Sequence, residues 1–433
     1  MNKILAGSLI GAVAVAGGLA GGSVYMGKKL EASYNNNFNL KDKRINIKTS
    51  GFEMGAMSGS ASWTAEITPD LCNTGLKLTV RSEDTISRSL SGYAVKSKIY
   101  LVPGEGRSDI LLFDADSTLG WSGSLSSEIG IPAGSFSPPK RGLSAEAEGQ
   151  EGGKMEWDKA TGRIKVSLND GEPLVSKMDF KLPSFRATDT SGYGSSFEIK
   201  NLSYTGSGDM GLSGMIQQSG SAVFTVESVS LRSRSPVSTV DLLLSGLKMS
   251  GESKIGKEGL SVKAESSIDK IEANKNIFDN IRLNYTVSGI SAEAVKKMQA
   301  LAERQSQVCL SAGEQETMLK DVMLALAAEG VKAESKGNQI HLNGTAVTAE
   351  GEASLSAGNY ASLDDLTDKI ESALKYKGSV SIDKGFISEV LKLVPNVEAQ
   401  ERAETEDKIV KSLVGELGAR EEGGKIILSR EKQ

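Results

Sequence analysis

Apolar and polar residues alternate over most of the chain between residues 45 and 290. The clearest segments are KLTV (77–80), SKIYLV (97–102), RIKVSL (163–168), SFEIKNLSY (196–204), AVFTVESVSL (222–231), GLSVKAESSI (259–268) and IRLNYTVSG (281–289). Clusters of turn-forming residues separate them, for example at 103–106, 169–171 and 206–209. A period of two residues is typical of strands that have one covered face. The pattern therefore predicts a long, curled antiparallel sheet for residues 45–290.

The period changes to that of a helix near Ser291. Residues 291–307 and 314–330 each carry an apolar stripe, and Gly330 suits the end of the second helix. Period two returns at 339–355, where Asn343-Gly344 predicts a hairpin turn. Further helices are expected at 363–374, 384–393 and 398–417, with a closing strand at 425–429. The chain is thus expected to be α+β but mostly β, with a β-rich body (45–290) and a smaller helical α+β C-terminal part (291–433).

Residues 4–26 form an uncharged stretch that is long enough to cross a membrane. Lys3 precedes the stretch, and Gly27-Lys28-Lys29 follows it. About 20 helical residues span the hydrocarbon core of a bilayer. We therefore expect a short tail (1–3), a transmembrane signal anchor (4–26) and a polar juxtamembrane linker (27–44).

Two other interpretations of the N-terminal stretch stay open. Ala14-Val15-Ala16 has the small-residue pattern of a signal-peptidase site, which would make the stretch a cleaved signal peptide. Alternatively, the stretch spans the membrane and leaves the body in the cytoplasm. Charge does not choose between the orientations, because the basic residues on the two flanks nearly balance.

Small residues recur along the expected span at intervals of three and four. They are Gly7, Gly11, Ala14, Gly18 and Gly22. This spacing places them on one helical face, where two backbones can approach closely. The stripe is a candidate dimer seam, and the alternative is the ordinary Ala/Gly richness of a signal segment.

Composition narrows the function classes. The formal net charge is −5, and a nucleic-acid surface would need a basic stripe instead. Aromatic content is 5% without a girdle pattern, which disfavours an outer-membrane barrel. Cys72 and Cys309 are the only cysteines, so they form either one disulfide in an oxidising compartment or two small buried side chains.

The sequence offers few residues for catalysis or cofactor binding. His341 is the only histidine and lies on an alternating segment, which favours a structural role. The glycines at 206–211 fit G-x-G-x-x-G but stand between two expected strands and open no helix. Asp364 and Asp365 follow Ser362 and fit a helix N-terminus. We therefore predict no catalytic, metal or cofactor-binding residues and no enzymatic activity.

The chain begins with Met1-Asn2-Lys3 and a soft span, followed by the junction Tyr25-Met26-Gly27-Lys28-Lys29-Leu30-Glu31. These residues carry a resemblance to the YdgA-like family of bacterial inner-membrane-anchored proteins of unknown function. The resemblance continues in order through the alternating strands, the paired helices at 291–330 and the closing segment at 413–428. It implies a single-pass inner-membrane protein with a periplasmic body and an envelope role, and it leaves a homodimer open. It supplies no catalytic residues.

Three function classes follow from these observations. The first is a non-enzymatic, membrane-anchored periplasmic protein whose partner is the lipid bilayer. The second, by analogy with anchored β-rich lipid-transfer proteins of the AsmA-like kind, is a protein that binds lipid or an acyl chain in an apolar β groove. The third is a hydrolase that uses paired carboxylates, for which the 55 acidic residues form no recognisable pair.

Overall fold

The structure is a computed structural model, and most of the chain after residue 44 is described. The described residues are 45–68, 71–72, 77–102, 108–120, 124–137, 153–169, 172–189, 194–211, 219–234, 239–257, 259–274, 276–394 and 398–432.

These residues form a sheet of 20 strands with five helices. The strands are β1 (Ile45–Met54), β2 (Ser58–Ile67), β3 (Leu78–Ser89), β4 (Gly92–Val102), β5 (Ile110–Gly120), β6 (Leu125–Ile131), β7 (Gly134–Phe136), β8 (Lys154–Trp157), β9 (Ala160–Asn169), β10 (Glu172–Thr188), β11 (Ser196–Gly211), β12 (Gly220–Arg234), β13 (Thr239–Gly256), β14 (Gly259–Ala273), β15 (Asn276–Ile290), β16 (Val331–Leu342), β17 (Thr345–Leu355), β18 (Leu374–Asp383), β19 (Arg420–Glu422) and β20 (Lys425–Lys432). The helices are α3 (Ala292–Gln307), α4 (Ala312–Glu329), α5 (Leu363–Ala373), α6 (Lys384–Lys392) and α7 (Ala399–Gly415).

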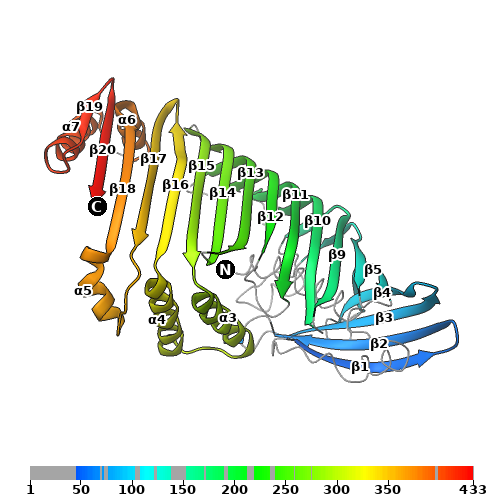
Figure 1. The fold of residues 1–433 in the computed structure, drawn as a ribbon. Coiled ribbons are helices and arrows are strands. Elements are labelled where there is room, and N and C mark those ends of the chain that lie inside the picture. Colours follow the sequence, from blue (N-terminus) through cyan, green and yellow to red (C-terminus); the bar gives the residue numbers. More distant parts are fainter. Residues whose placement is uncertain are drawn as a thin grey trace.

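Almost every strand pairs with the strand that follows it, and every pairing is antiparallel. The order is β1 to β6, then β9 to β18, then β20 and β19, while β8 pairs with the second half of β10 and β7 with β8. The sheet continues past residue 290, because β15 pairs with β16 across the connection made by α3 and α4. Figure 1 shows β1–β5 curled away from the plane of β10–β18. The expected long, curled antiparallel sheet is confirmed.

Strands β1–β6, β9 and β10 enclose the largest core. Buried side chains alternate with exposed ones along these strands, and Trp63, Ile86 and Ile99 are each at most 1% exposed. The same side also holds polar residues that bond one another: Ser117 Oγ lies 2.8 Å from Ser127 Oγ, and Ser82 donates to Asp84. A buried polar group is tolerated when it has a hydrogen-bond partner.

The apolar side of this core continues onto the middle of the sheet. One cross-strand row joins Ile129, Gly162, Phe180, Tyr204, Phe224, Met249, Ser266 and Leu283 through successive register pairs. We call the side of the sheet that carries this row the apolar face. Helices pack on two parts of it: α3 and α4 pack on Val262 of β14 and Val287 of β15, and α6 and α7 pack on Ile382 and Ile426 near the C-terminal edge of the sheet.

A second row of residues crosses β10–β15 at mid-strand. At this row, the alternation of side chains between the two faces of the sheet shifts by one residue. It comprises Pro183, Asn201, Glu227, Gly246, Asp269 and Asn280, each of which lies between two successive register pairs with a neighbouring strand. Asn201, Gly246 and Asn280, on alternate strands, have φ of +47°, +66° and +49°. A left-handed residue inside a strand redirects the side chains that follow it. This is why Leu244 and Leu247, which flank Gly246 on β13 and pair with Val229 and Val226, are three residues apart rather than two.

Gly246→Ala is expected to lower the free energy of unfolding by about 1–3 kcal/mol. A Cβ at Gly246 would sit 2.0 Å from Asp269 Oδ2 in a backbone conformation that favours glycine. The matched control is Gly251→Ala on the same strand, where the nearest atom is 3.8 Å from the new Cβ. Urea denaturation of both variants checks this, and equal losses would contradict it.

The helix and hairpin signals of the C-terminal part are largely confirmed. Asn343 (φ +48°) and Gly344 (φ +86°) form the turn between β16 and β17. Ser291 Oγ accepts the Ala294 N–H, and Ser311 with Glu314 forms a capping box that the sequence analysis missed. Asp365 lies in the first turn of α5, where its carboxylate accepts the Ala361 N–H.

Candidate functional site

None of the described helices packs on the middle of the apolar face, over β10–β13. Met249 lies there, and Leu283 and Tyr285 lie on the same face of β15, with exposed fractions of 48%, 57% and 52%. Phe180 and Phe224, in the same row, are half-buried. Tyr204 lies between them in this row, and burial raises the pKa of its hydroxyl. Contiguous exposed apolar surface of this kind commonly marks a binding site in a soluble protein region.

An open hollow of about 410 Å³ deepens the apolar face over β15–β18 and β20. Its lining includes Tyr285, Ala333, Ala353, Tyr376 and Leu428 and is almost entirely carbon. Tyr376 and Val380 are mid-strand on β18, between α5 at one end of the strand and α6 at the other. The volume lies within the range of sites that bind small ligands.

The hollow exists because two glycines pair on adjacent strands. Gly351 of β17 faces Gly378 of β18, and Ala353–Tyr376 and Ala349–Val380 are the pairs on either side. The glycine pair therefore leaves a gap between two rows of side chains. The sequence analysis missed this site, because a glycine within an alternating segment reveals a gap only once its cross-strand partner is known.

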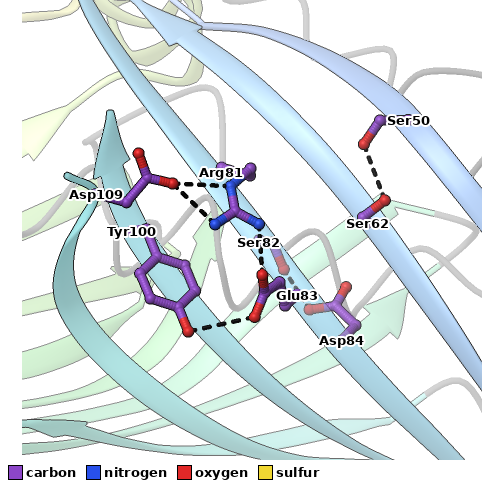
Figure 2. A network of polar contacts seen from close by, with 8 residues as sticks. All are labelled: Ser50, Ser62, Arg81, Ser82, Glu83, Asp84, Tyr100 and Asp109. Atoms are coloured by element: carbon purple, nitrogen blue, oxygen red, sulfur yellow. Dashed lines mark hydrogen bonds and ion pairs between the residues drawn. The ribbon is translucent and has the colours of Figure 1, made fainter. Parts of the chain in front are cut away.

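The opposite side of the sheet carries a polar network near its N-terminal end (Figure 2). Arg81 donates to Asp109 Oδ2 from Nε (3.1 Å) and Nη2 (2.8 Å), and to Glu83 Oε1 from Nη1 (2.5 Å). Tyr100 donates to the other Glu83 oxygen at 3.3 Å, and its ring centroid lies 4.9 Å from Arg81 Cζ. The Arg81 hydrogen bond lowers the pKa of Glu83. The set is mutually paired, which fits a structural role.

Glu83→Gln should remove a small, pH-dependent stabilisation. Because the folded-state pKa of Glu83 lies below its ordinary value of 4.5, its contribution is complete above that value and is lost as the pH falls through the folded pKa. The side chain is 51% exposed, so we expect at most about 1 kcal/mol at pH 7. Denaturation from pH 7 to pH 3 measures it, with exposed Glu53→Gln as control. If the difference in the free energy of unfolding between wild type and Glu83→Gln grew as the pH fell, it would contradict the lowered pKa of Glu83.

The two cysteines are brought together in the structure. Cys72 lies in the β2–β3 connection and Cys309 in the α3–α4 connection, and a disulfide joins them with a Cα–Cα distance of 4.9 Å. The bond links residues 237 positions apart. It therefore fastens the helical pair to the curled N-terminal strands.

The other sequence-predicted features are placed as follows. The candidate seam of Gly7, Gly11, Ala14, Gly18 and Gly22 lies outside the described residues, as does the expected span 4–26, and both stay predictions. None of the described helices is long and apolar enough to cross a bilayer. His341 lies beside Asp279, with 3.3 Å between Nδ1 and Oδ1. Within the described ranges, no three His, Cys, Asp or Glu side chains gather into a metal-binding group.

Comparison with known families gives one match, and it covers most of the chain. The profile of the family described as "Bacterial protein of unknown function (DUF945)" matches residues 105–427. The chain belongs to this family. The DUF945 region runs from the β4–β5 connection into β20, so it contains Cys309 but not Cys72, and it contains the lining of the hollow except Leu428 and Arg430. It is compatible with the resemblance to the YdgA-like family. No curated protein and no solved structure matches the chain.

Proposed function

We propose that this DUF945 member is a non-enzymatic, inner-membrane-anchored protein of the bacterial envelope whose body lies in the periplasm. The pairing of Cys72 with Cys309 carries the proposal. Structural disulfides persist in oxidising compartments such as the periplasm and are rare in the cytosol. The uncharged stretch at 4–26 supplies the anchor, and the non-enzymatic role rests on the lack of a catalytic set in the sequence.

Thiol labelling in intact cells tests the location of the body. The free thiols of the full chain are alkylated with a reagent that adds mass to each labelled cysteine. Labelling is done either directly or after mild reduction. Both cysteines are exposed, so reduction does not require unfolding. We expect no mass shift without reductant and a shift of two labels after it, including with a membrane-impermeant reductant and alkylator applied to spheroplasts.

A reporter that is active only in the cytoplasm, fused after Gln433, provides an independent measurement. The proposal expects no activity from this fusion. Free thiols in untreated cells together with strong reporter activity would place the body in the cytoplasm and overturn the proposal.

A second candidate function, acyl binding by the body, is favoured by the middle of the apolar face, on which no described helix packs. The exposed Met249, Leu283 and Tyr285 of the apolar face are continuous with the hollow, because Tyr285 also lines the hollow. Covering such a surface with hydrocarbon stabilises the complex by about 25 cal/mol per Å² of apolar area. The test is photolabelling of the full chain in nanodiscs with a diazirine fatty acid. Absence of label anywhere in residues 45–432 would exclude this function.

A further inference from the structure

The geometry points to a fatty-acid site in the hollow over β15–β18 and β20, in which the glycine pair receives the acyl chain and Arg430 binds the carboxylate. The inference rests on the second candidate function and gives it a location and a ligand. Three observations carry it: the shape of the hollow, the charge on its lining and the position of the neighbouring helices.

The shape suits an unbranched chain. The Gly351–Gly378 pair forms a floor without side chains between the row of Ala333, Ala353 and Tyr376 and the row of Val380 and Leu428. A Cβ at Gly351 would lie 3.1 Å from the Lys377 carbonyl oxygen, so a larger residue there would be crowded by the backbone as well as fill the floor. A gap one residue wide, with apolar rows on both sides, matches the cross-section of a hydrocarbon chain better than that of a branched or planar ligand.

The charge complements an acid. Successive residues of a strand point to opposite faces, so the lining residues Glu350, Glu352 and Lys377 alternate with Gly351, Ala353 and Gly378 and belong to the other side. There Glu352 pairs with Lys332 at 3.4 Å and Lys377 with Glu431 at 3.8 Å.

Arg430 differs from these charged residues, because it pairs with Gly378 and so lies on the apolar face at the end of the glycine row. Its Nη2 donates to the Leu417 carbonyl oxygen at 2.8 Å, which holds the guanidinium in place. It forms no ion pair with any of the described residues. Guanidinium binds carboxylate through paired N–H donors, and an amphiphile with one anionic head and one apolar tail satisfies both parts of the site.

The helices at both ends of β18 bound the site. Helix α5 ends at Ala373 and α6 begins at Lys384, one on each side of the strand segment that forms the floor. The Lys432 ammonium donates to the Glu371 carbonyl oxygen of α5 and so ties that helix to β20. The acyl chain therefore lies across the strands toward Tyr285, where the hollow joins the part of the apolar face on which no described helix packs.

Photolabelling of the full chain in nanodiscs with a diazirine-bearing palmitate tests the site. We expect the label on peptides from 331–353, 374–383 and 425–432. Ala353→Phe and Ala333→Phe should each reduce this labelling at least tenfold, because the ring occupies the hollow. Ala346→Phe is the matched control, since Ala346 is on β17 next to Val347 and faces the other side of the sheet. Thermal melts of all three variants establish that they are folded.

Arg430→Gln should lower labelling by the acid about tenfold, the effect of losing a charge-assisted hydrogen bond of about 1.4 kcal/mol, and should leave labelling by the matched photoreactive alcohol unchanged. Arg282→Gln, an exposed arginine on the other side of β15, is the control. Labelling confined to β11–β14 and unaffected by the phenylalanine variants would overturn this site while leaving acyl binding standing. Occupation by a second copy of the chain would appear instead as protein–protein cross-links that the same variants abolish.

Discussion

Replacing Cys72 and Cys309 with serine is expected to lower the free energy of unfolding by about 3–5 kcal/mol. The bond closes a loop of 237 positions between the β2–β3 and α3–α4 connections. Cross-linking residues so far apart restricts the unfolded chain strongly, and in the chain-entropy account the stabilisation grows with the logarithm of loop length. Urea denaturation of the full chain, followed by tryptophan fluorescence, measures the loss.

The two single variants and reduced wild-type protein provide the controls. Each lacks the same bond, so all should lose about the same free energy as the double variant. Reduction should have no further effect on the double variant. A double variant as stable as oxidised wild type would contradict the prediction.

Trp63→Ala is expected to cost about 3–5 kcal/mol, the range for large-to-small changes at buried aromatic residues. Trp63 is 1% exposed and is the largest fully buried side chain of the described residues. It lies on β2 between Thr49 of β1 and Ser82 of β3, inside the curl of the N-terminal strands. Its removal leaves a cavity inside the N-terminal core, and the neighbouring strands cannot close it without losing register.

Two further variants make the Trp63 measurement specific. Trp63→Phe retains a ring and should cost less than half as much. Leu90→Ala, at a fully exposed turn position, should change the free energy of unfolding by no more than about 0.5 kcal/mol. Equal losses for Trp63→Ala and Leu90→Ala would mean that the curl is not the principal core.

The sequence pattern predicts the strands well where one face is buried and the alternation is regular. The segments at 163–168, 222–231 and 281–289 all lie within observed strands, and the helices at 291–307 and 384–393 agree to within a residue. In each of these elements the apolar residues recur at a regular spacing, and turn or cap residues mark its end. The residues of the element itself are therefore enough to place it.

The missed elements have a common physical cause. Strand β13 was not predicted, because Leu242, Leu243 and Leu244 are consecutive and Gly246 shifts the alternation at mid-strand. Strand β18 was missed, because it follows α5 and precedes α6 without a connecting loop on either side. The hollow was missed for a related reason: it depends on which glycine lies beside Gly351, and cross-strand register is a property of the folded sheet.

The strand order gives the chain an unusually local set of contacts for a β protein. From β9 to β18 each strand pairs with its immediate successor, so the contact order of this part is low and hairpins can be added one after another as the chain is synthesised. The disulfide is the main exception. It can close only after α3 and Cys309 have been delivered, when β1–β15 have all been released. Synthesis therefore has to pass Cys309 of the 433 residues before the disulfide can fix the N-terminal curl to the rest, so topology alone places the oxidation late in folding.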